Sequence, residues 1–391
     1  MFTVKLAPGK DARLLAGHPW IYRSEIARVE DEGEPGAIAR VLDARGKFLG
    51  QAMVNPKSQI AGRLLTRNEE TVDRAFLERR IREAVSRCGR SVSGEDACRL
   101  VFGEGDHLPG LIADRYGALV GLQILTAGME RLREPLLAAL RSVVNPRAIF
   151  ERNDALPRKL EGLELRKGFA WGGGETGVWI REGDLRIFVE VPEGQKTGFF
   201  LDQRENRRVV KRLAKDREVL DCFCYSGGFA LSTAAGGAAS VTGIDLSAEA
   251  LAWARRRAEQ NGLASQSSFV AANAFDELRA FDRAGRRFGL LVLDPPAFTK
   301  GKETVAGALR GYKEINLRAM KLLAPGGILV TCSCSYHVDA PTFLEMLRSA
   351  AADAHREFRF VEFRTQASDH PILLAAKETQ YLKCVVLEAV H

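Results

Sequence analysis

The chain is predicted to be an α/β protein in which a doubly wound parallel sheet follows a small β-barrel and an α+β connecting segment. From about residue 190 onward, apolar strand-like runs alternate with helical patterns, which indicates a parallel sheet covered on both faces. Residues 1–70 contain short strand-like runs separated by turn residues, which is typical of a small barrel. Residues 71–188 mix both patterns and carry no chemical motif.

Length and composition fit an ordinary globular protein. At roughly 150 residues per domain, 391 residues suggest two or three domains. The hydrophobic fraction of 46% and the charged fraction of 27% exclude a disordered or fibrous chain. The formal net charge of +7 is spread as +2 over residues 1–70, +2 over 71–186 and +3 over 187–391. This distribution permits a polyanionic partner without requiring one.

The seven cysteines are an odd number and form no CxxC pair, which argues against a secreted disulfide framework. The N-terminus lacks the apolar segment of a signal peptide. The stretch most like a membrane span, Gly227–Leu246, contains Asp245 and reads as a helix followed by a strand. We therefore expect a cytoplasmic protein that has no membrane partner.

The first 70 residues contain two clear strand patterns, Ala37–Leu42 and Lys47–Val54, with turn residues around them. The sequence Gly-His-Pro-Trp-Ile-Tyr at 17–22 admits two interpretations. It can be a turn followed by core aromatics, or part of a nucleic-acid-facing surface. The residues alone favour the turn.

In the connecting segment, apolar residues from Val72 to Val85 recur at helical spacing. A second helix is expected over about Glu130–Val143. Strands are expected at Gly110–Asp114, Ala118–Leu125, Ala148–Glu151 and Leu185–Val191.

The third segment alternates strands with helices. The expected strands are Val219–Phe223, Ser240–Ile244, Ser268–Ala272, Gly289–Leu293 and Ile328–Cys332. Helices are expected over Gly227–Ala235, Ala248–Asn261 and Tyr312–Leu323, the last of them ended by Pro325-Gly326-Gly327. In such a sheet the ligand lies at the carboxyl ends of the strands.

Four motifs follow these strands within about 75 residues and in the order that a nucleotide-type cofactor needs. A glycine-containing loop, Asp221–Phe229, comes first, and Asp245 follows about 20 residues on, where an acid can bind a ribose diol. Asn273-Ala274-Phe275 and Asp294-Pro295-Pro296 follow the next two strands. The loop is not GxGxxG and no Walker lysine follows it, so the pattern favours S-adenosylmethionine over NAD or ATP.

With these motifs, residues from about 190 resemble a class I methyltransferase domain, and the whole chain resembles the PUA-linked 23S rRNA cytosine carbon-5 methyltransferases. The resemblance implies three parts: a PUA-like RNA-binding barrel over 1–70, an α+β connecting domain over 71–188 and a Rossmann-like S-adenosylmethionine-dependent methyltransferase domain over 189–391. It rests on the sequences at 17–22, 196–204, 221–229, 294–298 and 333–335.

The resemblance also implies a set of cofactor-binding residues. Asn273 departs from the family, in which an acid is common before the Phe, but the Ala274 backbone could still contact adenine. Asp294 corresponds to the acid beside the target base. The residues implied are Gln203 and Arg204 in the segment that folds over the cofactor, Phe223, Tyr225 and Gly227 beneath its methionine part, Asp245 at the ribose, and Asn273, Ala274 and Asp294.

Methylation of cytosine carbon 5 requires activation, because this carbon is a poor nucleophile. A cysteine thiolate that adds at carbon 6 supplies it, and a nearby carboxyl such as that of Asp294 stabilises the developing charge. Cys332 and Cys334 both follow an apolar strand, and strand alternation does not choose between them. We expect Cys334 to be the nucleophile, since it lies farther beyond the strand and matches the family's Ser-Cys-Ser. Whether Cys332 assists is left open.

The sequence also admits other interpretations of its cysteines and of its function. Four thiolates at Cys222, Cys224, Cys332 and Cys334 could bind zinc, but structural zinc sites use wider spacing in loops, so no metal is expected. The alternatives to the leading function are methylation of an exocyclic base amine, and RNA binding by a vestigial cofactor fold. A small-molecule methyltransferase would leave residues 1–70 unexplained. The expected partner is 23S rRNA or an assembly intermediate of the large subunit, and a homodimer is left open.

Overall fold

A computed structural model describes residues 2–31, 33–92, 94–299 and 302–390 of the chain. Its contacts divide the chain into two compact units. The first unit comprises Met1–Arg181, Phe188–Leu201 and Ser368–Gln380, and the second comprises Glu182–Ile187, Asp202–Ala367 and Tyr381–His391. The domain boundaries expected after residues 70 and 188 stay predictions.

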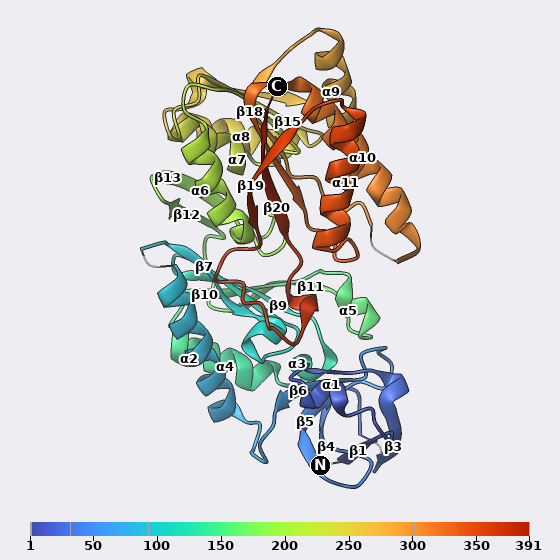
Figure 1. Cartoon of the computed structure of the whole chain (residues 1–391). Helices are drawn as coiled ribbons and strands as arrows, with labels where there is room; N and C mark the ends of the chain where they lie inside the picture. The colour runs from blue at the N-terminus through green and yellow to red at the C-terminus, as the bar shows by residue number, and fades with distance from the viewer. Residues whose placement is uncertain (1, 32, 93, 300–301, 391) are drawn as a thin grey trace. The chain divides into compact units, whose positions relative to one another are not determined.

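The first unit begins with a six-stranded sheet of order β2-β6-β5-β4-β1-β3 (Figure 1). β1 pairs parallel with β4, and the other neighbours pair antiparallel. Its strands and its short helix are β1 (Phe2–Leu6), α1 (Ala12–Leu15), β2 (Trp20–Ile21), β3 (Ile26–Glu30), β4 (Ala37–Leu42), β5 (Phe48–Val54) and β6 (Gly62–Thr66). The two strands predicted in this region correspond to β4 and β5.

A second sheet of the same unit has the order β11-β10-β9-β8-β7, with only β9 and β10 parallel. Helices α2 and α4 contribute buried leucines and isoleucine to its core. The elements are α2 (Arg74–Ser91), β7 (Ala97–Phe102), β8 (Leu111–Tyr116), β9 (Leu119–Ile124), α3 (Ala127–Arg131), α4 (Arg133–Val144), β10 (Ala148–Asn153), α5 (Pro157–Leu160) and β11 (Arg166–Trp171). The prediction of one helix over Glu130–Val143 is wrong: there are two helices, and α3 begins earlier because the Thr126 hydroxyl accepts the Met129 N–H.

The second unit is built on a seven-stranded sheet of order β16-β15-β14-β17-β18-β20-β19. Its first five strands are parallel, as predicted, and β20 runs antiparallel to both of its neighbours. Strands β12 (Gly177–Glu182) and β13 (Leu185–Glu190) form a separate two-stranded sheet, and the residues of each are divided between the two units. The other elements of the second unit are α6 (Arg204–Leu213), β14 (Glu218–Cys222), α7 (Gly228–Ala235), β15 (Ser240–Asp245), α8 (Ala248–Gln260), β16 (Ser267–Ala271), α9 (Ala274–Arg283), β17 (Phe288–Leu293), α10 (Val305–Leu322), β18 (Leu323–Ser333), α11 (Ala340–Asp353), β19 (Phe358–Arg364) and β20 (Lys383–Ala389).

Two predicted boundaries in this unit are wrong. The helix expected from Tyr312 begins at Val305. The prediction missed this start because Gly307 and Gly311 in the first turns weaken the helical signal in the sequence. The strand expected from Ile328 begins at Leu323, since the chain passes through Pro325–Gly327 at an irregularity of the β17–β18 pairing and then continues as a strand.

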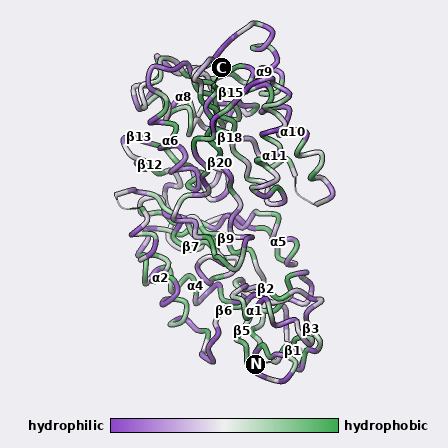
Figure 2. Tube along the Cα trace, viewed as in Figure 1, coloured by the Kyte–Doolittle hydropathy of each residue, from purple (hydrophilic) through white to green (hydrophobic). Residues whose placement is uncertain are grey.

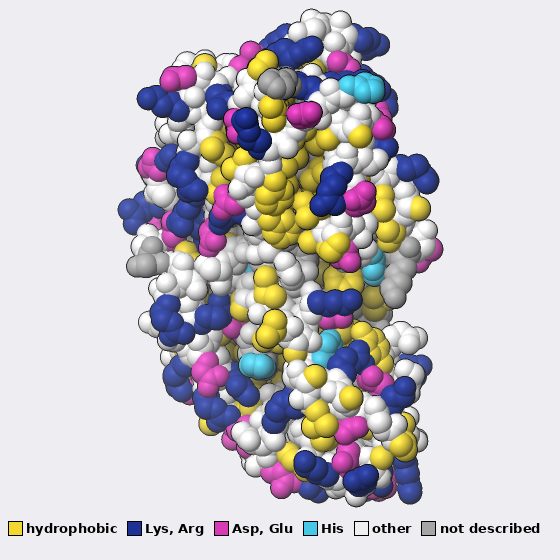
Figure 3. All heavy atoms as spheres, viewed as in Figure 1, with side chains coloured by type: hydrophobic (Ala, Val, Ile, Leu, Met, Phe, Trp, Pro, Cys, Tyr) yellow, Lys and Arg dark blue, Asp and Glu magenta, His cyan; other side chains and the backbone are white. Residues whose placement is uncertain are grey.

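Hydropathy follows this architecture in each unit. The central strands of the seven-stranded sheet are apolar, and the helices that cover it carry polar outer faces (Figure 2). Lys and Arg are scattered over the face drawn in Figure 3, and hydrophobic side chains gather where Figure 1 places β19. On that edge strand Phe360 is 56% exposed and Val361 49%. Among the described residues, no helix combines the length and apolar character that crossing a bilayer demands.

Residues of the Gly-His-Pro-Trp-Ile-Tyr sequence form hydrogen bonds within the first unit. The Trp20 amide donates to His18 Nδ1 over 3.1 Å, so His18 carries its proton on Nε2 and donates it to Glu378 over 3.1 Å. The Trp20 indole N–H donates to Glu104 over 2.9 Å. These contacts agree with the interpretation as a turn followed by packed aromatics.

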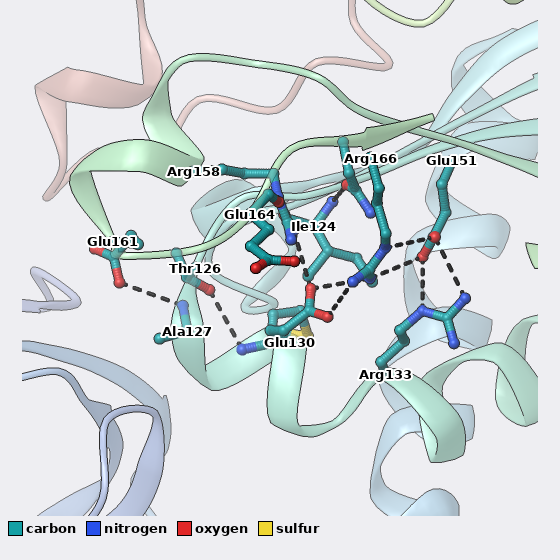
Figure 4. Close-up of polar contacts among 12 residues, drawn as sticks. Ile124, Thr126, Ala127, Glu130, Arg133, Glu151, Arg158, Glu161, Glu164 and Arg166 are labelled. Carbon is teal, nitrogen blue, oxygen red and sulfur yellow. Dashed lines mark hydrogen bonds and ion pairs between the residues drawn. The ribbon is translucent and has the colours of Figure 1, made fainter. Parts of the chain in front are cut away.

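An ion-pair network ties β10 and β11 to the helices beneath them (Figure 4). Glu151 is 3% exposed and accepts from Arg133 and Arg166, each over 2.9 Å. Arg166 also donates to Glu130 over 2.6 Å, and the buried Arg158 donates to the same carboxylate over 2.9 Å. Burial opposes ionisation of Glu151, but the two guanidinium groups outweigh it and lower its pKa.

Replacement of Glu151 by Gln is therefore expected to destabilise the protein by about 2 kcal/mol, because it removes the buried carboxylate that Arg133 and Arg166 share. The pKa of Glu151 is lowered in the fold, so its contribution is present at neutral pH and is lost as pH falls through that lowered value. Urea unfolding at pH 7 and at about pH 3 measures both effects.

Glu134→Gln is the matched control, since Glu134 also pairs with Arg133 but is 80% exposed. An exposed pair contributes about 0–1 kcal/mol. Equal losses in the two variants would contradict the role assigned to Glu151.

Candidate functional site

Polar residues of the second unit gather where the parallel strands end. Asp221 is the penultimate residue of β14, and Asp245 is the last residue of β15. Asn273, Asp294 and Cys334 follow β16, β17 and β18. Because these strands are neighbours and parallel, their carboxyl ends meet at one edge of the sheet. The four motifs and the candidate nucleophile predicted from the sequence therefore share this edge.

The loop after β14 has an unusual backbone. Phe223, Tyr225 and Gly227 have φ angles of 65°, 48° and 82°, so two side-chain-bearing residues occupy the left-handed region. That region is costly for residues other than glycine and is often found at functional sites. The loop is held in this shape by hydrogen bonds to β15: the Cys224 amide donates to the Ile244 carbonyl over 3.0 Å, and the Tyr225 amide to Asp245 Oδ2 over 2.9 Å.

Three carboxyl groups interact at this edge. Asp221 is fully buried; its Oδ2 accepts the Ala230 N–H over 2.8 Å, while its buried Oδ1 makes no hydrogen bond within the described structure. Burial, together with the negative charges of Asp294 and Asp245, raises the pKa of Asp221 well above its usual range. A cationic ligand seated here would relieve this repulsion and could pair with the free oxygen.

Gln203 joins the segment before α6 to the strand ends. Its amide nitrogen donates to Asp294 Oδ1 over 3.0 Å, and its carbonyl oxygen accepts from Asn206 over 2.7 Å. Two of the predicted site residues, Gln203 and Asp294, are thus in direct contact.

Three buried arginines lie in this region: Arg257 supports the loop after β14, and Arg204 and Arg207 pair with Glu182. Arg257 of α8 donates to the Ser226 carbonyl over 2.9 Å, and its burial lowers its pKa to about 10. Arg204, a predicted cofactor residue, is 2% exposed and lies 3.7 Å from the Glu182 carboxylate. Arg207 binds the same carboxylate through two nitrogens.

An aromatic cluster lies behind the loop after β17. The Phe298 ring is 4.6 Å from that of Tyr312, 6.1 Å from Phe275 and 6.4 Å from Phe223, measured between centroids. It fixes the segment that follows Asp294-Pro295-Pro296. Asn273 caps α9, with its Oδ1 accepting the Phe275 N–H over 2.9 Å, so its side chain serves the helix start.

The two candidate cysteines differ in surroundings. Cys332 is fully buried within β18, opposite Cys384 of β20, and the hydrogen bond between the two thiols, followed by burial, raises its pKa well above the usual value. Cys334 lies one residue beyond β18 and is the one cysteine of the seven that is not buried. Accessibility therefore favours Cys334, which stays the predicted nucleophile.

The segment around Cys334 is fastened on both sides. The Tyr312 hydroxyl hydrogen-bonds Ser335 Oγ over 2.8 Å and Ser333 Oγ over 3.1 Å. Lys383, which pairs with Ser333 across the strands, donates to the Ser335 carbonyl over 2.7 Å. Burial raises the pKa of the Tyr312 hydroxyl, so it stays protonated and able to donate at neutral pH.

Sequence reasoning did not single out Asp221 or Lys383 as site residues. Asp221 stands within the quoted loop and at a strand end, which is a usable signal. Lys383 has none, because only the β18–β20 pairing brings it to this edge. Among the described residues, no group of three or more His, Cys, Asp or Glu side chains is placed to hold a metal ion.

Comparison with known proteins gives two family matches. Residues 4–67 match a PUA-like domain, and residues 167–383 match the S-adenosylmethionine-dependent methyltransferase family. Curated relatives cover almost the full chain. Ribosomal RNA large subunit methyltransferase I of Klebsiella pneumoniae strain 342 is 41% identical over 97% of this chain and 96% of its own length, and that of Erwinia tasmaniensis is 40% identical over 97% of each.

Solved structures share the fold over the whole length. A protein of Streptococcus mutans described as a candidate S-adenosylmethionine-dependent methyltransferase has a TM-score of 0.86 at 18% identity, covering 99% of this chain and 100% of its own. A candidate methyltransferase solved with S-adenosylhomocysteine has a TM-score of 0.87 at 19% identity, with the same coverage.

The carboxylate cluster fits S-adenosylmethionine, which carries positive charge on its sulfonium and amino groups. Since repulsion and burial keep a proton on Asp221, a bound cation is expected to expel it. Affinity should then increase as pH rises toward the raised pKa of Asp221, by at most about tenfold per pH unit for one proton. Calorimetry in buffers of different ionisation enthalpy measures both the affinity and the proton release.

Asp221→Asn should remove the pH dependence, because an amide keeps the bond from Ala230 but does not titrate. Asp276→Asn is the control, since Asp276 lies in the first turn of α9 and is 71% exposed. A wild-type slope retained by the Asp221 variant would show that another group releases the proton.

Proposed function

The chain belongs to the ribosomal RNA large subunit methyltransferase I family, and on this premise we propose that it methylates carbon 5 of a cytosine in 23S rRNA through a covalent adduct with Cys334. The PUA-like domain over 4–67 supports an RNA substrate, since it supplies a second, separate surface besides the methyltransferase domain. Its transferred methyl group comes from S-adenosylmethionine.

One observation carries the choice of carbon 5. Cys334 and Asp294 leave adjacent parallel strands, β18 and β17, at the same edge of the sheet. A thiol and a carboxyl at one edge of the sheet are the pair that carbon-5 chemistry needs: one to add to the ring and one to stabilise the charge that this addition creates. Cys334 is also the accessible thiol.

The proposed reaction begins at Cys334. Its thiolate forms a bond to carbon 6, and the electron pair of the C5–C6 double bond moves toward carbon 5 and the ring nitrogen. Asp294, steadied by Gln203 over 3.0 Å, stabilises the negative charge that develops there: in its protonated form, its carboxyl O–H donates to the ring nitrogen. S-adenosylmethionine, when bound, supplies the electrophilic methyl group for carbon 5. Carbon 5 then loses its proton to water, the C6–S bond breaks, and the electron pair returns to sulfur.

The remaining predicted residues are proposed to hold the cofactor. The left-handed backbone at Phe223, Tyr225 and Gly227 turns the loop beneath the methionine part. Asp245 already accepts from two backbone amides and retains lone pairs for a ribose diol. The Asn273 side chain is used to cap α9, so the backbone of the buried Ala274 is the proposed adenine contact instead.

Cys334→Ala is expected to lower the methylation rate at least about 10³-fold, because the thiolate carries the covalent step and general electrostatic effects are left without it. Cys332→Ala is the matched control: it removes a buried thiol two residues away, and methylation should persist. Transfer of labelled methyl to deproteinised 23S rRNA measures the rate, and nucleoside mass analysis identifies the product.

The outcomes separate the alternatives. A Cys334→Ala protein that makes methylcytosine at the wild-type rate would contradict the covalent mechanism. A product methylated on an exocyclic amine would identify the other target atom, to which the Asp294-Pro295-Pro296 loop is also suited. Absence of S-adenosylmethionine binding in calorimetry would indicate an RNA-binding protein with a vestigial cofactor fold.

The same assay addresses the form of the substrate. Deproteinised 23S rRNA and assembled large subunits are tested side by side, and mapping of the labelled nucleotide gives the target position. Light scattering of the purified protein reports whether it is the homodimer that the sequence left open.

A further inference from the structure

Lys383 is a buried cation that the proposed reaction does not yet use. It is 4% exposed and stands at the first position of β20, opposite Ser333 of β18. Its Nζ donates to the Ser335 carbonyl over 2.7 Å and to the Tyr381 carbonyl over 2.8 Å. A buried lysine is costly unless its charge or its proton is put to use.

Lys383 contacts the segment that carries Cys334. Ser335, whose carbonyl receives the Lys383 hydrogen bond, is the residue next to Cys334. The charge of Lys383 interacts with Cys334 and with Asp339, the N-cap of α11. The two carbonyls take two of the Nζ hydrogen-bonding directions, which leaves one for a third N–H or, in the uncharged amine, for the lone pair.

We propose that Lys383 is the cationic partner of Cys334, the positioning residue that keeps this thiol ionised at neutral pH. The Sγ–H bond of Cys334 breaks, its electron pair stays on sulfur, and the proton leaves to water. The positive charge of the Lys383 ammonium group stabilises the thiolate. When the C6–S bond later breaks, the returning thiolate finds the same ammonium.

The acid–base balance of Lys383 suits this role. Burial lowers its pKa to about 8, and the negative charges of Cys334 and Asp339 oppose that shift. At neutral pH Lys383 is therefore still largely the ammonium, which is the form that stabilises a neighbouring thiolate. Tyr312 faces the same segment from α10 and stays neutral, since burial raises its pKa. This inference rests on the proposed function only for the use of the thiolate.

Alkylation of Cys334 by iodoacetamide tests the proposal without RNA or methyl transfer. Cys334 is the accessible thiol of the seven, and peptide mass mapping assigns the modified residue. In the wild type, the midpoint of the rate against pH should lie at least one unit below the ordinary thiol value of about 8.5. In Lys383→Met it should rise by at least one unit, so that alkylation at pH 7 slows by about tenfold or more.

Lys383→Arg should restore a midpoint within about half a unit of the wild type, since it keeps the charge that stabilises the thiolate. Lys215→Met is the control, because Lys215 is an exposed lysine of the same unit and should leave the profile unchanged. Binding of S-adenosylmethionine by calorimetry checks that each variant is folded.

An unchanged midpoint in folded Lys383→Met would overturn the proposal, and so would a wild-type midpoint at or above 8.5. If the Met variant does not fold, Lys383→Gln keeps two donors for the carbonyls, lacks the charge and is read in the same way. Failure of the proposed function looks different: Cys334→Ala would then still methylate cytosine, while the alkylation midpoint would continue to respond to Lys383.

Discussion

Register between neighbouring parallel strands determines where each side chain of the candidate site lies. Cys222 of β14 stands level with Ile244 of β15 and Leu293 of β17, and Leu293 stands level with Thr331 of β18. The next residues on β14, β15 and β17 are Phe223, Asp245 and Asp294, and β18 continues through Ser333 before it reaches Cys334. A shift of one residue in any of these pairings would turn the side chains of that strand to the opposite face, so the apolar core and the site depend on the same register.

The features of the site that destabilise the fold lie in the loop after β14 and in the carboxyl groups around it. Phe223 and Tyr225 occupy backbone conformations that side-chain-bearing residues rarely adopt, and Asp221 is buried with an oxygen that has no hydrogen bond in the described structure. Neither feature stabilises the fold by itself. The hydrogen bonds to Ile244 and Asp245 hold the loop in this conformation, and the proposed cationic cofactor would relieve the repulsion among the carboxyl groups beside it.

The antiparallel strand β20 adds chemistry that the five parallel strands do not contain. Its pairing with β18 sets Cys384 against Cys332 and Lys383 against Ser333. The first pair leaves Cys332 buried, which makes it the less accessible of the two candidate nucleophiles. The second places the buried Lys383 next to the segment of Cys334, so the same pairing supports both the proposed nucleophile and its proposed partner.

Sequence alone determined the alternation of strands and helices, the four motifs at strand ends and their order, because apolar runs, glycines and acids at fixed positions are local signals. Strand periodicity did not choose between Cys332 and Cys334, since both fit the same period of two, and the preference for Cys334 came from its place beyond the strand and its match to the family's Ser-Cys-Ser. The sequence alone also missed the start of α10, whose glycines weaken the helical pattern, and gave no sign of Lys383. Burial of Cys332, the contact of Gln203 with Asp294 and the place of Lys383 were decided only by tertiary structure, because each depends on pairing between segments far apart in the chain.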